Sequence, residues 1–238
     1  MLAKLGKTSH PHLVSLLGAY CHRKSNYLIF DWADSDLSKY WRQHNPKPEF
    51  NHDTVLWVVA QCAGLASGLQ QIHRYGSILA SNNPSPNQMD PKLYGRHGDI
   101  KPENILWFRE KNGGGTLKIC DFGVAEFHTK NSRSNRSNSR IATSPFYCSP
   151  ESELRNGQIS RSYDIWSMGC LYLEFLGWLL GGWNMVRLMS IERERRSVNR
   201  DFPDENPYYD IDDLQITAKI KPEVTRASPY LLPSAVEW

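Results

Sequence analysis

His97-Gly98-Asp99-Ile100-Lys101-Pro102-Glu103-Asn104 is the stretch of sequence that decides the fold. Its last residue begins a short apolar segment, 104–108, and a second apolar segment, 116–120, follows in the chain. The connection between them, 111–115, is Lys-Asn-Gly-Gly-Gly, which is typical of a hairpin turn. Directly after the second segment stands the triplet 121–123, Asp-Phe-Gly. The pattern predicts two paired strands that bracket a group of charged and amide side chains.

Each of these motifs has an ordinary structural explanation when it is taken alone. Asp-Phe-Gly is a common turn tripeptide, and Asn or Asp at a strand end usually caps backbone groups. Two further motifs follow in the same chain, Ser149-Pro150-Glu151 and Asp164-Ile165-Trp166-Ser167-Met168-Gly169. Chance assembly of all four in this order is very improbable, so the motifs are interpreted together.

Together the motifs resemble those of the eukaryotic-type protein kinase catalytic domain of the Ser/Thr class. Residues 97–104 are similar to the catalytic loop H-R-D-L-x-x-x-N, with Gly98 in place of the arginine. Residues 149–151 look like the A-P-E signature, and a lysine at position 101 is typical of Ser/Thr rather than Tyr kinases. The resemblance implies an α+β, protein-kinase-like fold, mainly the α-helical large lobe with a remnant of the small-lobe sheet and regulatory helix.

Phosphoryl transfer needs a carboxylate that orients and deprotonates the attacking hydroxyl, oxygen ligands for Mg²⁺, and positive charge on the moving phosphoryl group. The resemblance assigns the catalytic base to Asp99 and the γ-phosphate contact to Lys101. It assigns the Mg²⁺ ligands to Asn104 and Asp121. ATP and Mg²⁺ are therefore the expected cofactors, and the expected substrate is a Ser or Thr hydroxyl of a protein.

Nucleotide binding is assigned on the same basis. Phe30-Asp31-Trp32 looks like the hinge between the lobes, with Phe30 as its gatekeeper, and Leu106 would form the lower face of the adenine pocket. The expected cofactor-binding residues are Phe30, Asp31, Asp36, Lys101, Glu103, Asn104, Leu106 and Asp121. The family's regulatory spine would include Leu5, Leu16, His97 and Phe122, which can equally be described as core residues.

The chain is expected to form one partial kinase domain. Residues 1–32 would be a remnant of the small lobe and the hinge strand, and residues 33–238 the large lobe, incomplete at its C-terminus. The chain is expected to lack both the Gly-rich loop and the Val-Ala-Ile-Lys strand, which would stand before Met1. Because those parts normally cover and pair the phosphates, this chain alone is expected to be weak or inactive.

Further elements are predicted from hydrophobic periodicity and capping residues. They are a helix at Met1–Lys7, a strand at Asn26–Trp32, a short helix at Asp34–Trp41, a long helix capped by Asp53 or Thr54, an inserted surface loop between His73 and His97, an apolar helix from Ile165 to Gly182, and a final helix begun by a capping box at Ser234–Glu237. The long helix carries one apolar stripe, Val55, Val58, Val59, Cys62, Leu65, Leu69 and Ile72.

Three residues outside the chemistry carry expectations of their own. Asp164 resembles the buried helix aspartate that holds the catalytic-loop backbone. Glu151 would lack its usual arginine partner from a late helix. Because Gly98 stands where related enzymes have an arginine that reads an activation-segment phosphate, activation by loop phosphorylation is not expected.

Composition limits the partners. The chain has 28 basic and 25 acidic residues, a balance that favours neither nucleic acid nor a membrane. Its five cysteines are an odd number and widely spaced, as in reduced intracellular proteins, so cytoplasm or nucleus is the expected location. The apolar run 165–182 is the only stretch judged close to a membrane span, and it is better explained as a buried helix. The basic segment 130–140 is expected to be a solvated loop, and an RNA-associated function has little support.

A second function stays open beside the enzyme. A kinase-like lobe without its cover could act as a non-catalytic, pseudokinase-like interaction module that binds partners through its exposed cleft. Retention of all four chemical residues favours the kinase. A Gly-rich loop and a strand lysine encoded upstream of Met1 would favour it further, and their absence there would favour the module.

Overall fold

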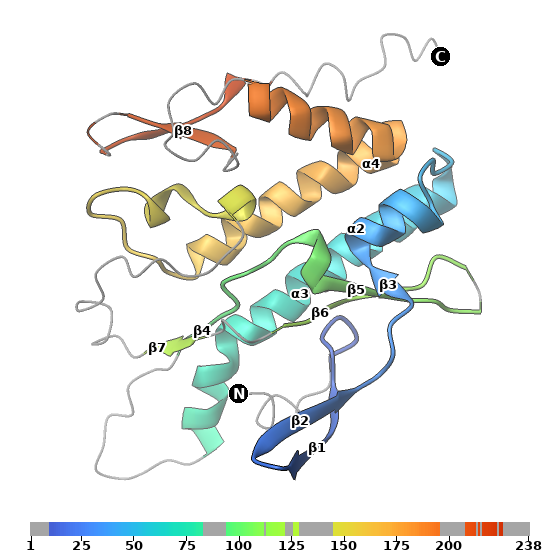
Figure 1. The fold of residues 1–238 in the computed structure, drawn as a ribbon, viewed down its shortest axis with the longest axis vertical. Helices are drawn as coiled ribbons and strands as arrows, with labels where there is room; N and C mark the ends of the chain where they lie inside the picture. Colours follow the sequence, from blue (N-terminus) through green and yellow to red (C-terminus); the bar gives the residue numbers. More distant parts are fainter. Residues whose placement is uncertain are drawn as a thin grey trace.

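The computed structural model describes residues 10–82, 94–111, 113–121, 126–128, 145–195, 208–212, 214, 216–222 and 224–225. Two long helices, α3 (His52–Asn82) and α4 (Ser162–Arg195), form the body of the molecule (Figure 1). The expected helices at Met1–Lys7 and after Ser234 lie outside the described residues. The mixture of strands and long helices agrees with the α+β class expected from the sequence.

Helix α3 begins where Asn51 caps it. The Asn51 side-chain oxygen accepts a hydrogen bond of 2.9 Å from the Thr54 backbone N–H. The prediction that Asp53 or Thr54 is the cap was therefore wrong by two or three residues, because Asn competes equally well for this position. The predicted apolar stripe faces the core at Val58, Leu65, Leu69 and Ile72, whereas Val59 is 58% exposed.

The same helix runs through much of the predicted surface loop. It continues to Asn82, and strand β4 (Tyr94–Arg96) follows within the predicted loop and pairs antiparallel with β7 (Glu126–His128). The prediction of a loop from His73 to His97 was therefore wrong over 74–82 and 94–96. Extending an existing helix adds one hydrogen bond per residue without a new nucleation cost, so the lack of a clear apolar period in 74–82 did not stop it.

A three-stranded antiparallel sheet lies against the two helices, in the order β3 (Ser35–Asp36), β5 (Ile105–Phe108), β6 (Thr116–Ile119). The predicted hairpin of β5 and β6 is confirmed, with Ile105 opposite Ile119. Its turn is held by two indole groups: Trp57 Nε1 donates to the Gly115 carbonyl and Trp107 Nε1 to the Gly114 carbonyl, each at 2.7 Å. Strand β5 begins directly after Asn104, and strand β6 ends shortly before Asp121, so the sheet fixes the positions of both motifs.

The segment between β3 and α3 is helical, as predicted for its first part. It forms α2 (Leu37–Lys39) and then a π-helical turn, Tyr40–His44. Tyr40 and Trp41 from this turn pack against Phe175 and Trp178 of α4. This aromatic cluster is the centre of the main core, and it joins the sheet side of the molecule to α4.

Helix α4 changes direction at Gly182, where its predicted apolar part ends. Gly182 has φ 68° and ψ −167°, a conformation open almost only to glycine. A Cβ there would stand 2.5 Å from the Pro46 carbonyl oxygen, to which the Trp183 N–H donates at 2.8 Å. The charged sequence after Gly182, for which no helix was predicted, continues as helix to Arg195. Because of the kink, the second part of α4 lines one cavity together with α2 and the catalytic-loop segment 101–103.

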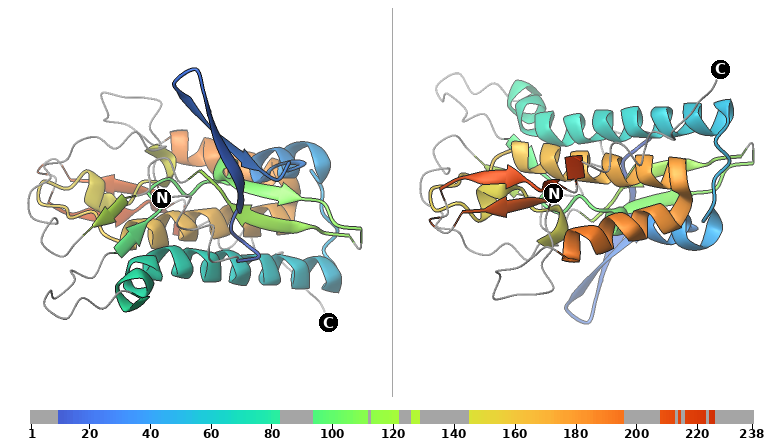
Figure 2. Two further views of the ribbon diagram at one scale, coloured as in Figure 1. Left: turned by 90° about the horizontal axis from the view of Figure 1, so that it is seen from below. Right: turned by 90° about the horizontal axis from the view of Figure 1, so that it is seen from above.

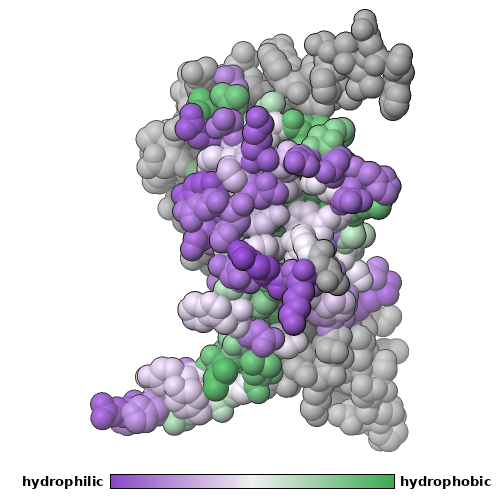
Figure 3. All heavy atoms as spheres, turned by 90° about the vertical axis from the view of Figure 1, so that its right-hand side faces the viewer, coloured by the Kyte–Doolittle hydropathy of each residue, from purple (hydrophilic) through white to green (hydrophobic). Residues whose placement is uncertain are grey.

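Strands β1 (Leu16–His22) and β2 (Ser25–Phe30) form a separate antiparallel hairpin that projects from the helices (Figure 2). The predicted strand 26–32 corresponds to β2. Apolar residues of the hairpin are exposed, among them Leu17, Leu28 and Ile29. Hydrophobic atoms gather at the lower end of the molecule, at the level of this hairpin (Figure 3). Strands β8 (Tyr209–Ile211) and β9 (Ala218–Ile220) form another small hairpin.

Among the residues that the structure describes, two helices are long and apolar enough to cross a membrane, His52–Arg74 and Ser162–Arg193, whereas the sequence analysis noted one apolar run. This is weak support for a membrane segment, since core helices of soluble proteins pass the same test. Here the apolar side chains of both helices contribute to the main core.

Candidate functional site

The structure brings three predicted chemical side chains into direct contact. The Asp99 carboxylate oxygen Oδ2 lies 2.8 Å from Lys101 Nζ and accepts a second bond of 2.8 Å from the Asn104 amide. The same amide also donates to the Asp99 carbonyl at 2.8 Å. Asp99 and Asn104 are buried, and Lys101 is partly exposed. One carboxylate is thus held in a fixed orientation beside a cation that reaches solvent.

The backbone below this cluster is anchored by Asp164 at the start of α4. Its carboxylate accepts bonds of 2.8 Å from the N–H groups of both His97 and Gly98. His73 of α3 donates to the same carboxylate at 2.7 Å. The expected structural role of Asp164 is therefore confirmed. The contribution of His73 was missed, because nothing in its local sequence distinguishes it from a core residue.

His97 is held as a neutral imidazole. Its Nε2 donates to the Cys120 carbonyl at 2.8 Å, and its Nδ1 accepts a bond of 3.2 Å from the Asp99 N–H. Only the tautomer that carries its proton on Nε2 can make both bonds. Burial lowers the pKa of His97 from its usual value, which keeps the ring neutral.

Acidification should therefore loosen this loop. Because the His97 pKa is lower in the folded than in the unfolded chain, the unfolded state binds more protons as the pH falls below about 6.5. Urea unfolding measured at pH 7.5 and 5.5 should show a loss of unfolding free energy at the lower pH. The loss should be smaller in His97→Gln, although His10 and His12, whose pKa values burial also lowers, retain part of it. An equal loss in the variant would contradict this role of His97.

The two expected metal ligands lie at neighbouring strand ends. The Cys120 N–H donates to the Asn104 carbonyl at 2.9 Å, which ties the residue before Asp121 to the start of β5. Asp121 has a φ of 58°, in the left-handed region that Asp tolerates better than most residues. An amide and a carboxylate are hard oxygen ligands of the kind that Mg²⁺ prefers when substrate phosphates complete its shell. The residues present therefore fit the expected metal.

The expected nucleotide contacts are only partly brought together. Asp36 and Leu106 are cross-strand neighbours in the pairing of β3 with β5. Asp36 also caps α2, since its side chain accepts a bond of 2.7 Å from the Lys39 N–H. Phe30 ends strand β2, and Asp31 and the neighbouring Trp32 are exposed, the latter by 94%. Phe122 and Leu5 lie outside the described residues.

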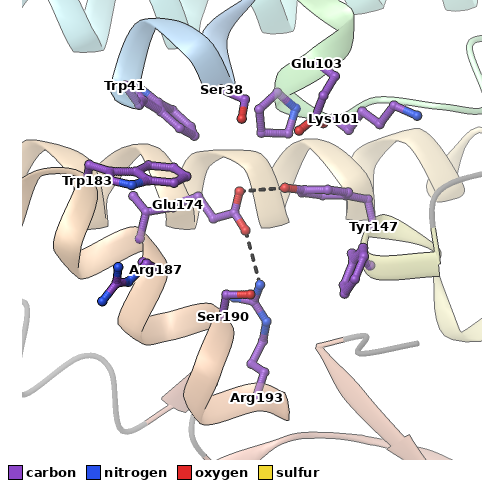
Figure 4. A pocket seen from close by; sticks show the side chains of 13 residues that line it. Ser38, Trp41, Lys101, Glu103, Tyr147, Glu174, Trp183, Arg187, Ser190 and Arg193 are labelled. Carbon is purple, nitrogen blue, oxygen red and sulfur yellow. Dashed lines mark hydrogen bonds and ion pairs between the residues drawn. The ribbon is translucent and has the colours of Figure 1, made fainter. Parts of the chain in front are cut away.

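A cavity of about 460 Å³ opens beside the catalytic-loop lysine. It lies between α2, the segment 101–103 and the second part of α4 (Figure 4). Glu103, which is expected to contact nucleotide, also lines this cavity. A wall of the cavity is formed by Glu174, which the sequence analysis did not single out. The only sign of Glu174 in the sequence is that a glutamate interrupts an otherwise apolar helix.

Glu174 is the centre of a buried hydrogen-bond network. The hydroxyls of Tyr147 and Tyr208 each donate to its carboxylate at 2.7 Å, and Arg193 Nη2 lies 3.3 Å from it. Burial, followed by the nearby negative charge, raises the pKa of both tyrosines well above the usual value, so both remain donors. The network joins residue 147 to both parts of α4.

One carboxylate oxygen of Glu151, Oε2, is buried and has no hydrogen-bond partner within the described part of the chain, in line with the expectation from the sequence. The remaining predicted motif, the basic segment 130–140, lies outside the described residues.

Comparison with known proteins places these features in a family. The family model "Protein kinase domain" matches residues 2–180. Cyclin-dependent kinase C-2 C of Arabidopsis thaliana is 31% identical over 174 residues, which cover 72% of this chain and 22% of that protein. Probable cyclin-dependent kinase 8 of Dictyostelium discoideum is 30% identical, with 72% of this chain and 40% of that protein covered.

A solved structure is also similar. The yeast RNA Pol II CTD kinase CTDK-1 complex contains a chain that matches with a TM-score of 0.52 and 26% sequence identity, over 74% of this chain and 48% of that one. The chain thus spans less than half the length of these known proteins. Since the family model covers well over half of this chain and the catalytic-loop geometry agrees with it, the chain belongs to the protein kinase family.

Proposed function

We propose that this chain carries the large-lobe part of a protein serine/threonine kinase, which transfers the γ-phosphoryl group of ATP to a Ser or Thr hydroxyl. The observation that carries the proposal is the contact of Lys101 and Asn104 with one oxygen of Asp99, both at 2.8 Å. Such an arrangement fixes a carboxylate base beside a cation, as transfer between two oxygens requires.

Each residue has a distinct task in this proposal. Asp99 orients the substrate hydroxyl and accepts its proton as the oxygen attacks. Lys101 places positive charge where the negative charge of the moving phosphoryl group grows. Asn104 and Asp121 would hold Mg²⁺, which would neutralise charge on the phosphates of bound ATP. ATP would supply the γ-phosphoryl group, and ADP would leave. Asp164 and His97 act through the backbone, by keeping Asp99 in place.

Membership of the kinase family supports a protein as the substrate, but it identifies no specific partner. The lysine at 101 supports Ser and Thr over Tyr as acceptors. An intracellular site of action, in the cytoplasm or nucleus, is part of the same proposal.

The proposal is tested by incubating the purified chain with labelled Mg·ATP and a generic basic protein, followed by phosphoamino-acid analysis. We expect slow labelling confined to serine and threonine. The rate should be low, because the described residues include neither a Gly-rich loop nor a Val-Ala-Ile-Lys strand to cover and pair the phosphates. Label on tyrosine would contradict the proposed acceptor, and no label from a folded chain would contradict the expectation that this chain transfers phosphate by itself.

A non-catalytic interaction module is the second candidate. It is supported by the exposed apolar side chains of the β1–β2 hairpin, Leu17, Leu28 and Ile29. A folded chain that transfers no phosphate and binds no ATP would leave the module as the better description.

A further inference from the structure

The segment 10–14, which stands directly before strand β1, is fastened to the body of the molecule by paired backbone groups. Leu13 forms an isolated parallel bridge with Ile119 of β6. The Val14 N–H donates to the Ile119 carbonyl at 3.0 Å, and the Ile119 N–H donates to the His12 carbonyl at 2.9 Å. Because the β1–β2 hairpin projects from the helices (Figure 2), this segment is its attachment on the side of the first strand.

His10 accepts a hydrogen bond that only its neutral ring can accept. The His12 N–H donates to His10 Nδ1 at 3.1 Å, and His10 Nε2 lies 3.2 Å from Ser67 Oγ of α3. Nδ1 must therefore be unprotonated, which places the proton of the neutral ring on Nε2, facing Ser67. A second proton would go to Nδ1 and would set two donors against each other. Protonation of His10 therefore removes the bond to the His12 backbone.

His12 leaves equally little room for a second proton. Its Nδ1 donates to the Leu117 carbonyl at 2.7 Å, so the neutral ring carries its lone pair on Nε2. That corner of the ring points at α3: a Cβ added at Gly64 would stand 2.0 Å from Nε2 and 2.3 Å from the two ring carbons beside it. A proton on Nε2 would meet the interior of a helix, where the carbonyl groups already accept bonds from within the helix.

The groups around the two rings do not compensate a positive charge. The ring centroids of His10 and His12 lie 6.0 Å apart, and Lys118 of β6 repels a charge on His12. Helix α3 meets the rings with Ser67 and with its backbone at Gly64, neither of which titrates between pH 5 and 8. Within the described part of the chain, no carboxylate pairs with either ring. Burial is the main cause that lowers the pKa of both histidines, against the bond to a backbone carbonyl at His12.

We propose that His10 and His12 form an acid-sensitive latch, which holds the segment 10–14 to α3 and β6 while both rings are neutral and releases it when they are protonated. The released segment binds more protons than the fastened one below the usual histidine value of about 6.5, so the open form gains as the pH falls through this value. Release frees the β1–β2 hairpin and, with it, Phe30, the expected gatekeeper. The latch does not depend on phosphate transfer, so its test is separate from that of the proposed function.

Hydrogen exchange of the full chain at pH 7.5 and 5.5, followed by mass spectrometry, tests the latch. Fragments that contain the Val14 and Ile119 amides report opening of the segment, and fragments that contain Leu171 and Phe175 of α4 report opening of the whole chain. Protection is corrected for the intrinsic pH dependence of exchange. Each ring can increase opening at pH 5.5 by at most about tenfold. We expect protection at 14 and 119 to fall by roughly tenfold relative to protection in α4.

Three variants assign the response to the two rings. The double variant His10→Asn/His12→Asn keeps an acceptor and a donor close to the two Nδ1 positions but cannot titrate, so it should lose the relative acid response. The matched control is His52→Asn, since the His52 side chain is 81% exposed, and it should respond as the unaltered chain does. Gly64→Ala should open the latch at both pH values, because its methyl group takes the place of the His12 ring, although alanine favours the helix itself.

Two results would overturn the inference. An equal loss of protection at 14, at 119 and in α4 would show that acid opens the whole chain and not the latch. A full acid response in the double asparagine variant would assign the titration to another group. A chain with a working latch that transfers no phosphate would keep the inference and contradict the catalytic expectation, and a chain that transfers phosphate but shows no selective opening at pH 5.5 would do the opposite.

Discussion

Replacing Asp164 by alanine should lower the free energy of unfolding by about 3–5 kcal/mol, the largest stability effect that we expect from one polar side chain. Asp164 is fully buried, and its carboxylate accepts bonds from the His97 and Gly98 N–H groups and from His73. Its removal leaves these donors buried and without an acceptor. Urea unfolding monitored by tryptophan fluorescence measures the change.

Asp53 provides the matched control. It also pairs with a histidine, His52, but at 3.4 Å and with its side chain 97% exposed. Exposed pairs of this kind contribute between about 0 and 1 kcal/mol, so Asp53→Ala should change stability little. If Asp164→Ala shifted the unfolding midpoint no more than Asp53→Ala does, the anchoring of the catalytic loop by α4 would be refuted.

The catalytic loop and its hairpin could be predicted from the sequence because their chemistry is local. The turn needs glycine, and Gly113, Gly114 and Gly115 all have positive φ. The spacing of residues 97–104 places Asp99, Lys101 and Asn104 on one short loop, where the structure finds them in contact. Asp164 was predictable only through the family resemblance, since its partners are distant in sequence.

What could not be predicted depends on long-range packing. Two helical segments were not predicted: α3 beyond His73, where the sequence has no clear apolar period, and α4 beyond Gly182, where a glycine and the charged residues from Glu192 onward indicated an end to the helix. The network around Glu174 joins residues 147, 193 and 208, and no periodicity relates such separations. For the same reason the cavity itself, which Glu103 and Glu174 line, could not be predicted.

Asp99→Asn should have the largest effect on function. Asparagine has nearly the same shape and retains an oxygen that can accept a hydrogen bond from Asn104, so the loop should stay folded. It cannot take up the proton of the substrate hydroxyl and has no charge to pair with Lys101. Loss of a general base usually costs 10²–10⁴-fold in rate, so we expect a drop of roughly this size in phosphate transfer.

The most direct measurement of the central claim compares phosphate transfer from labelled Mg·ATP by the unaltered chain and by Asp99→Asn, purified in parallel and shown by urea unfolding to be equally folded. The account predicts measurable transfer to serine or threonine by the first and at least a hundredfold less by the second. Equal rates in the two proteins would show that the label comes from another source, and would contradict the assignment of Asp99 as the base.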